Sequence, residues 1–411
     1  MQQVIVIGGG VVGLTSAWWL LEAGFGVTLL ESAPAVATGA SYRNGGQLSY
    51  RYVSPLADAG VPLKALGWLF ERDAPLRFKP EADLRQWKWL LQFLRSCDAD
   101  INRTTTTVLL RLGELSRVSM AQMEAVVPKD QFAWRESGKL VVYRSRASFD
   151  AAAAKGGDAG LVLSAAECVA REPALAAAEG MLAGGIFNAG EAVADCHAFS
   201  TALAARLLEH PRFGGIVHAE ARRFVTLKGK VSAIDTSAGP MQADAYVLAA
   251  GIRSRALADT AGIYLPLYPV KGYSLSAPIR ATDRAPEISV TDFERKVLYA
   301  RIGDQLRVAA MADIVGENTR IDERRVAGLV RQVRDTMPHA ADYDKLSIWA
   351  GLRPATPGSA PIIGATPLSN LWVNVGQGPL GFTFACGSAR VLADVMSGKA
   401  PPIPLDGLSL R

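Results

Sequence analysis

The first 31 residues alternate between apolar runs and turn residues in an order typical of a strand, a helix and a second strand. Val4-Ile5-Val6-Ile7 is a continuous run of β-branched residues, the pattern of a strand buried on both faces of a parallel sheet. Apolar positions then recur at helical spacing over residues 11–23. Residues 27–30 predict the next strand, which Glu31 closes.

A glycine-rich turn joins the first strand to the helix. Glycines at positions 8, 10 and 13 form the pattern GxGxxG. In a dinucleotide site, the first permits the tight turn, the second lets the backbone approach the pyrophosphate, and the third packs helix against strand. Glu31 lies 18 positions after Gly13, where a carboxylate accepts hydrogen bonds from ribose hydroxyls. The segment therefore predicts a dinucleotide site, and Glu31 disfavours NADP because it would repel a 2′-phosphate.

The remaining pattern predicts an α/β fold in which a Rossmann-like nucleotide domain is interleaved with an antiparallel-sheet (α+β) substrate domain. We assign 1–60, 195–265 and 345–411 to the nucleotide domain and 61–194 and 266–344 to the substrate domain. The predicted elements are a loop at 38–48, mostly helix over 62–127, a strand at 138–144, a helix at 147–155, a helix at 195–209 capped by Asp195, strands at 216–225, 230–236 and 245–251, an antiparallel sheet over 266–312, a helix at 322–337, strands at 346–350 and 371–375, and a last helix ending near 396.

Composition and charge narrow the class of protein. The net charge of +5 is spread without a Lys/Arg block, so we expect no nucleic-acid partner. The cysteines at 97, 168, 196 and 386 lack CxxC spacing and predict reduced core thiols and no metal site. Only Met1-Gln2-Gln3 precede the first strand, and no apolar run is long enough to span a membrane, so we expect a cytoplasmic protein.

One predicted helix is both amphipathic and aromatic. Its members, with a neighbouring tryptophan, are Leu84, Trp87, Trp89, Leu90, Leu91, Leu94 and Trp68, interspersed with Arg85, Lys88 and Arg95. Such a helix either lies on a membrane surface or packs on its own domain. The first alternative would make the protein peripheral on the inner face of a membrane.

Several stretches match one family in its order along the chain. They are the glycine loop, Asn44-Gly45-Gly46-Gln47, Ser54-Pro55, residues 60–65 and 68–70, residues 243–247, Tyr299-Ala300-Arg301, Gly351-Leu352-Arg353-Pro354 and Ala385-Cys386-Gly387-Ser388. In these stretches the chain resembles the FAD-dependent D-amino-acid dehydrogenases of the small-subunit type, within the larger group of D-amino-acid and glycine oxidases.

The resemblance implies FAD and oxidation of an amino acid to an imino acid, which hydrolyses to a 2-oxo acid and ammonia. It also implies that the electrons pass to a quinone or another acceptor, not to oxygen. The loop at 376–381 would favour negative charge on the reduced flavin. The residues expected at the FAD site are Gly8, Gly10, Val11, Val12, Gly13, Glu31, Ser32, Ser41, Asn44, Gly45, Gly46, Gln47, Leu48, Ala221, Ala250, Gly251, Gly378, Pro379, Leu380, Gly381 and Thr383.

The substrate end combines an arginine clamp with polar neighbours. Arg353 is predicted to bind the substrate carboxylate, because a guanidinium forms two parallel hydrogen bonds with it. The alternative role for Arg353 is an interdomain salt bridge. Tyr273, Tyr52 and Gln377 are further substrate-contact candidates. Because the flavin performs the oxidation, no protein base is required, and the histidines at 197, 210, 218 and 339 are interpreted as structural or surface residues.

Two loops depart from the family pattern. The family usually has Arg-Pro-Met-Thr-Pro-Asp-Gly where residues 353–359 read Arg-Pro-Ala-Thr-Pro-Gly-Ser, and Gly-His-Gly-Thr-Leu-Gly-Trp-Thr where 376–383 read Gly-Gln-Gly-Pro-Leu-Gly-Phe-Thr. These changes leave open a dehydrogenase of a cyclic secondary amino acid such as D-proline or D-hydroxyproline. Two further alternatives are a flavin-bearing subunit inactive without partner chains and an oxidase that uses oxygen directly.

Overall fold

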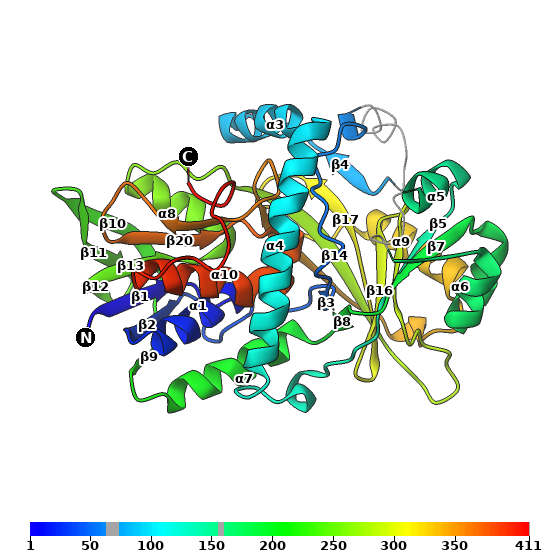
Figure 1. Cartoon of the computed structure of the whole chain (residues 1–411), viewed down its shortest axis with the longest axis horizontal. Coiled ribbons are helices and arrows are strands. Elements are labelled where there is room, and N and C mark those ends of the chain that lie inside the picture. The colour runs from blue at the N-terminus through cyan, green and yellow to red at the C-terminus, as the bar shows by residue number, and fades with distance from the viewer. Residues whose placement is uncertain (63–73, 155–159, 411) are drawn as a thin grey trace.

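The computed structural model describes residues 1–62, 74–154 and 160–410. Two β-sheets lie beside one another, and the long helix α4 (Ala99–Met123) crosses between them in the view of Figure 1. One sheet is mainly parallel and the other mainly antiparallel. This confirms the predicted α/β class with an antiparallel second sheet.

The six-stranded sheet has the order β19-β20-β13-β1-β2-β9. Neighbouring strands are parallel, except that β19 runs antiparallel to β20. The strands are β1 (Gln3–Ile7), β2 (Gly26–Glu31), β9 (Phe213–His218), β13 (Ala245–Leu248), β19 (Ile362–Ala365) and β20 (Leu371–Val375). Because β2 and β13 flank β1 on opposite sides, the carboxyl end of β1 is the point where an open α/β sheet binds its ligand.

Helices and a small sheet cover the two faces of this sheet. On one face, α1 (Val11–Glu22) packs against α10 (Gly381–Met396) and α7 (Cys196–Glu209), and α4 packs over α10. Their apolar side chains form one core with Val4, Val6 and Val27 of the sheet. The other face contacts α8 (Ser254–Thr260) and an antiparallel sheet of β10 (Ala221–Leu227), β11 (Lys230–Thr236) and β12 (Gly239–Met241).

The nine-stranded sheet has the order β18-β14-β17-β16-β15-β5-β7-β6, with β4 paired to β17. Its strands are β4 (Leu76–Phe78), β5 (Lys139–Tyr143), β6 (Leu161–Leu163), β7 (Gly184–Asn188), β14 (Tyr268–Pro278), β15 (Ser289–Asp292), β16 (Val297–Ile302), β17 (Gln305–Ile314) and β18 (Ser347–Ala355). The helix α9 (Glu323–Thr336) covers one face through Val326, Leu329 and Val333. The opposite face of the sheet is directed toward the first domain and the ligand cavity.

The remaining described elements are β3 (Gln47–Leu48), α3 (Leu84–Ser96), η1 (Lys129–Phe132), α5 (Arg146–Ala153), α6 (Ala165–Arg171), η3 (Pro173–Met181), β8 (Ala192–Val193), η4 (Gly251–Arg253), η5 (Tyr343–Lys345) and η6 (Gly378–Leu380).

Several local predictions need correction. The predicted strand at 216–225 is two strands, since β9 joins the parallel sheet and β10 joins the small sheet. β18 continues through Arg353 to Ala355 and pairs with β14, because main-chain pairing to its long neighbour extends past Gly351. It therefore lies in the nine-stranded sheet, although we assigned 345–411 to the nucleotide domain. Similarly, α4 packs on α10 of the first domain, whereas we assigned residues 61–194, which include α4, to the substrate domain.

Further predictions concern the cap of α7, the burial of the cysteines and the segments around Trp68 and Lys155. Asp195 caps α7 by accepting from the backbone N–H of Ala198, as predicted. Three of the four cysteines are buried and all four are free, whereas Cys97 is only partly buried. Some predictions lie outside the described residues. They concern Trp68, the family-matching segments 63–65 and 68–70, and Lys155, the last residue of the helix predicted over 147–155.

Candidate functional site

A large cavity lies between the two sheets. It has a volume of about 1870 Å³, above the roughly 300–1000 Å³ of an ordinary small-molecule pocket. Its wall includes the turn after β1, the ends of β2 and β13, the loop 37–49 and the uncovered face of the nine-stranded sheet. A dinucleotide together with a small substrate would fit a space of this extent.

The glycine turn has the geometry that a pyrophosphate requires. Gly8 has φ +111°, and a Cβ at this position would lie 2.6 Å from the carbonyl oxygen of Ala249. A Cβ at Gly13 would lie 1.8 Å from the carbonyl oxygen of Gly8, so this glycine sets the close contact between α1 and β1. A Cβ at Gly10 would meet only Ser41 Oγ, at 3.4 Å. Gly10, Val11 and Val12 line the cavity, so the start of α1 fits a phosphate.

Two side chains brace this turn. Glu31 accepts hydrogen bonds from the backbone N–H groups of Gly9 (2.6 Å) and Ala33 (2.8 Å). Its carboxylate is thereby held at the end of β2, on the cavity wall, with lone pairs left for ribose hydroxyls. Ser41 Oγ accepts from the N–H of Val11 at 3.0 Å, which ties the following loop to the start of α1.

The loop 43–49 crosses the nine-stranded sheet in close contact. Ser274 Oγ donates to the Arg43 carbonyl (2.6 Å), and Arg307 donates to the Asn44 carbonyl (2.8 Å). A Cβ at Gly45 would lie 3.2 Å from Leu298 and one at Gly46 2.3 Å from Ile302. The glycines therefore allow the loop to lie flat between the sheet and the ligand cavity.

Arg353 lies in β18 at the opposite end of this sheet face, and the tertiary structure makes room for it. Its guanidinium covers Gly272, where a Cβ would lie 2.3 Å from Nη2. Nη1 donates to the Met311 carbonyl at 2.9 Å. Met311 has φ +65° and lies where the pairing of β14 and β17 changes register. Such a bulge is a common way to redirect a group at a functional site.

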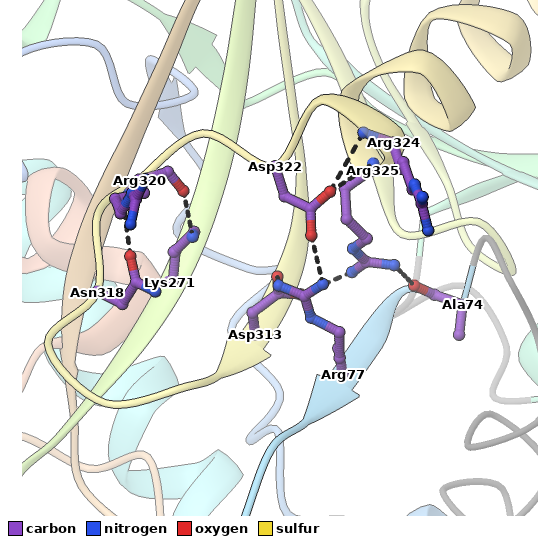
Figure 2. Close-up of polar contacts among 9 residues, drawn as sticks. All are labelled: Ala74, Arg77, Lys271, Asp313, Asn318, Arg320, Asp322, Arg324 and Arg325. Carbon is purple, nitrogen blue, oxygen red and sulfur yellow. Dashed lines mark hydrogen bonds and ion pairs between the residues drawn. The ribbon is translucent and has the colours of Figure 1, made fainter.

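The charge on Arg353 is not neutralised locally. Burial lowers the pKa of Arg353 to about 10, and Asp313 opposes this shift, so the guanidinium is cationic at neutral pH. Asp313 itself is paired with Arg77 (3.0 Å) and Arg325 (2.7 Å) on the α9 side of the sheet. Figure 2 shows these three residues with Asp322, which also binds Arg77 at 2.6 Å. Arg353 therefore has donors available for an anionic ligand in the cavity.

Tyr273 lies on the α9 side of β14. Along this strand, Gly272 and Ser274 face the loop 43–49 and Arg353, so Tyr273 faces the other side. Its ring packs in the cluster that contains Leu329 and Val333 of α9. Burial first, then Asp313, raises the pKa of Tyr273 to about 12. Tyr273 borders the cavity without presenting its hydroxyl to a substrate, because strand alternation directs its side chain away.

Gln377 is also used within the protein. Its Nε2 donates to Asn374 Oδ1 at 2.7 Å, and Asn374 donates in turn to Ser16 Oγ at 3.0 Å. The side chain is buried and its amide N–H₂ supports the turn before η6, while Gln377 also lines the cavity. Tyr52 lines the cavity and remains a candidate for substrate contact.

The predicted FAD residues all line the cavity except Gly13 and Leu48. Gly13 performs the packing role described above, whereas Leu48 is fully buried in the core of the first domain. Thr383 Oγ1 lies 3.3 Å from both the N–H of Ser49 and the carbonyl oxygen of Gln47, and thus joins the loop 43–49 to α10. For Leu48, strand alternation next to Gln47 could have predicted the inward orientation.

Sequence reasoning missed Lys139, Gly272 and Met311. Lys139 begins the otherwise apolar strand β5, and a lone lysine in such a run was the available signal. Nothing local marks Gly272 or Met311, since their roles depend on the neighbouring strand. Within the described ranges, no group of three or more His, Cys, Asp or Glu residues could hold a metal ion, and none of the four histidines lines the cavity. No described helix is long and apolar enough to cross a membrane.

Comparison with known proteins defines the class. The family model described as "DAO: FAD dependent oxidoreductase" matches residues 3–395, and the chain belongs to this family of FAD-dependent oxidoreductases. FAD is therefore the cofactor that the glycine turn, Glu31 and the loop 43–49 would hold.

The relatives are full-length matches. The chain is 48% identical over 412 residues to "D-amino acid dehydrogenase 2" of Pseudomonas aeruginosa, covering 100% of this chain and 98% of that protein. It is 44% identical to "D-amino acid dehydrogenase 2" of Ralstonia nicotianae, covering 98% of each. A glycine oxidase structure from Geobacillus kaustophilus shares the fold, with a TM-score of 0.78, 19% identity, and coverage of 100% of this chain and 99% of that one.

Proposed function

We propose that this protein is an FAD-dependent dehydrogenase of D-amino acids. The observation that carries the proposal is Arg353, a cation on the wall of the cavity. Asp313, the carboxylate that opposes the shift of its pKa, is already engaged by two other arginines. A buried cation is costly unless an anion pairs with it, and an amino-acid carboxylate matches the guanidinium fork. The names of the relatives support the D-amino acid as the substrate class.

The chemistry divides between the cofactor and the chain. Bound FAD supplies the oxidation of the Cα–N bond to the imino acid, which water hydrolyses to a 2-oxo acid and ammonia. Arg353 orients the substrate through its carboxylate, with its own position set by Met311 and Gly272. The cavity wall on this sheet includes small or apolar residues such as Ala309 and Leu298, which would exclude water from the reacting atoms.

A substrate panel tests this function. Under anaerobic conditions, D-alanine should bleach the flavin absorbance, and L-alanine should do so at least about 100-fold more slowly, because a carboxylate fixed by Arg353 presents Cα–H of one enantiomer only. D-Proline and D-hydroxyproline belong in the same panel, because the loops 353–359 and 376–383 depart from the family pattern. Faster bleaching by these cyclic amines would assign the second candidate function. Bleaching by no amino acid would refute both.

We also propose that the electrons pass to a quinone or another acceptor in preference to oxygen. The purified chain should then reduce an artificial dye or a soluble quinone without releasing peroxide at the rate of turnover. Peroxide formed at that rate would identify an oxidase. Inactivity of the single chain with every dye, despite flavin bleaching by substrate, would favour the subunit that requires partner chains.

Peripheral contact with a membrane is a further part of the proposal. The helix α3 buries Gln86, Trp89 and Phe93 against its own domain. Its opposite side exposes four large apolar residues at helical spacing, namely Leu84 (86% exposed), Trp87 (46%), Leu91 (51%) and Leu94 (46%). Of the flanking cations, Arg85 is paired with Asp259 at 2.7 Å, whereas Lys88 and Arg95 suit anionic lipid headgroups.

Replacing Leu91 with glutamate should weaken binding to vesicles rich in anionic lipid by about tenfold or more, because it removes buried apolar area and adds a repelled charge. Vesicle sedimentation measures the bound fraction. Leu227→Glu is the matched control, since Leu227 is similarly exposed (63%) but lies on β10. Equal binding by the wild type and Leu91→Glu would contradict membrane contact through α3.

A further inference from the structure

Lys139 is a buried lysine on the cavity wall that the proposed reaction does not use. It lies at the start of β5 and is 2% exposed. Its Nζ lies 2.8 Å from Gln47 Oε1 and 3.0 Å from Ser49 Oγ, and 4.1 Å from the centre of the Tyr52 ring. Gln47, Ser49 and Tyr52 also line the cavity. The lysine therefore supports the segment of loop that forms the wall on the flavin side.

Gln47 is held at both ends of its carboxamide. Its oxygen accepts from Lys139, while its Nε2 donates to Ser289 Oγ and, at 3.5 Å, to Thr291 Oγ1. Ser289 and Lys139 are partners in the parallel pairing of β5 and β15. This arrangement fixes one orientation of the amide, with the lysine charge directly behind it.

The surroundings are consistent with either protonation state of Lys139. An ammonium donates to Gln47 and Ser49 and places its remaining proton by the Tyr52 ring, whereas a neutral amine donates to Gln47 and accepts from Ser49. Burial lowers the pKa of Lys139 to about 7, and Glu191 opposes that shift. Glu191 is the carboxylate that faces it from the loop before β8, and it accepts the backbone N–H groups of Tyr50 and Arg51.

Other charged and titratable groups near β5 have partners of their own or lie further away. Asp292 of β15 is bound to Arg144 at 2.6 Å. Tyr143, on β5 itself, stacks near Phe293, and burial raises its pKa to about 12. Arg51 contributes its backbone to Glu191. Lys139 and Glu191 are thus the pair of groups that can change the charge behind Gln47.

We propose that Lys139 is a positioning residue of the flavin site, which orients Gln47 and raises the reduction potential of the bound FAD by placing a positive charge behind this wall. Reduction by substrate adds two electrons and one proton to the flavin and leaves it with one negative charge. A lysine ammonium stabilises that charge, and the proton that it holds comes from solvent. The inference rests on FAD as the cofactor and is independent of which amino acid is oxidised.

The test compares Lys139→Met with the wild type through sulfite binding, since sulfite adds to oxidised flavin and leaves the same negative charge as reduction. At a fixed pH of 6.5, the dissociation constant for sulfite should rise about tenfold in Lys139→Met. The midpoint potential, measured against a reference dye, should fall by the corresponding ~30 mV for a two-electron couple. Lys139→Arg retains the charge and should remain closer to the wild type than Lys139→Met does.

Lys129→Met is the matched control, because Lys129 also lies over an aromatic ring, that of Trp134 (5.2 Å), but outside the cavity. It should leave sulfite binding and potential unchanged. A second measurement uses only the wild type: between pH 6 and 9, reduction should take up an additional proton beyond that of the flavin. The proposal would be overturned if Lys139→Met left the sulfite dissociation constant and the midpoint potential unchanged. If this variant does not fold, the absence of additional proton uptake by the wild type would overturn it.

Discussion

Replacing Arg353 with alanine should raise the KM for the amino acid by about 10²–10³-fold while the protein keeps its FAD. Removing one partner of a buried ion pair costs about 3–5 kcal/mol, and each 1.4 kcal/mol corresponds to about tenfold in affinity. The guanidinium lies on the cavity wall, and Asp313, the carboxylate among the described residues that acts on its pKa, is engaged by Arg77 and Arg325. Steady-state kinetics with a dye acceptor, together with the flavin absorbance, measures the effect.

Two further variants sharpen this result. Arg353→Lys keeps the charge but loses the two-pronged geometry, so its KM should lie between those of the wild type and Arg353→Ala. Arg301→Ala is the control from the same sheet, because Arg301 is paired with Glu287 and lies outside the cavity wall. A nearly normal KM for Arg353→Ala would assign this arginine to the alternative role of an interdomain contact.

Replacing Gly10 with alanine should yield a folded protein that binds FAD about 100-fold more weakly. The added methyl group meets only Ser41 Oγ, at 3.4 Å, and the φ of −76° suits alanine. It would nevertheless stand where the pyrophosphate approaches, and overpacking of about 3 kcal/mol accounts for the loss. Quenching of flavin fluorescence on titration with the apoprotein measures affinity, and thermal unfolding followed by circular dichroism reports the fold.

The other glycines separate cofactor loss from misfolding. Gly13→Ala should fail to give soluble protein, because its Cβ would lie 1.8 Å from the backbone oxygen of Gly8. Gly180→Ala, in η3, meets nothing within 4 Å and should behave as the wild type. If Gly10→Ala bound FAD with wild-type affinity, the assignment of the phosphate site to this turn would be wrong.

The nucleotide half could be predicted because its signals are local. The run Val4–Ile7, the glycine spacing and the acid at position 31 each constrain the backbone within a few residues. The strand pairing of β1, β2 and β13 agrees with them. The sheet to which β18 belongs could not be predicted for the opposite reason, since its pairing with β14 is a contact between segments about 80 residues apart and leaves no local pattern.

In the substrate half, local sequence patterns did not predict the orientation of the side chains. Arg353 and Tyr273 were both selected as polar residues near the expected flavin face, but their orientations differ. Arg353 covers Gly272, whereas Tyr273 packs toward α9. Sequence alone does not reveal the bulge at Met311 or which face of β14 is covered by α9.

By itself, the sequence determined the dinucleotide turn and the alternation that builds the two sheets, because glycine spacing, β-branched runs and caps act over a few residues. The clamp at Arg353 stays a prediction that rests on the family resemblance and on guanidinium chemistry. The tertiary structure alone decided which side chains share the cavity. It placed Lys139 behind Gln47 and directed Met311 toward Arg353. It also directed the Tyr273 ring toward α9 and engaged the amide of Gln377 with Asn374. These outcomes depend on the pairing and covering of distant strands, which no short stretch of sequence encodes.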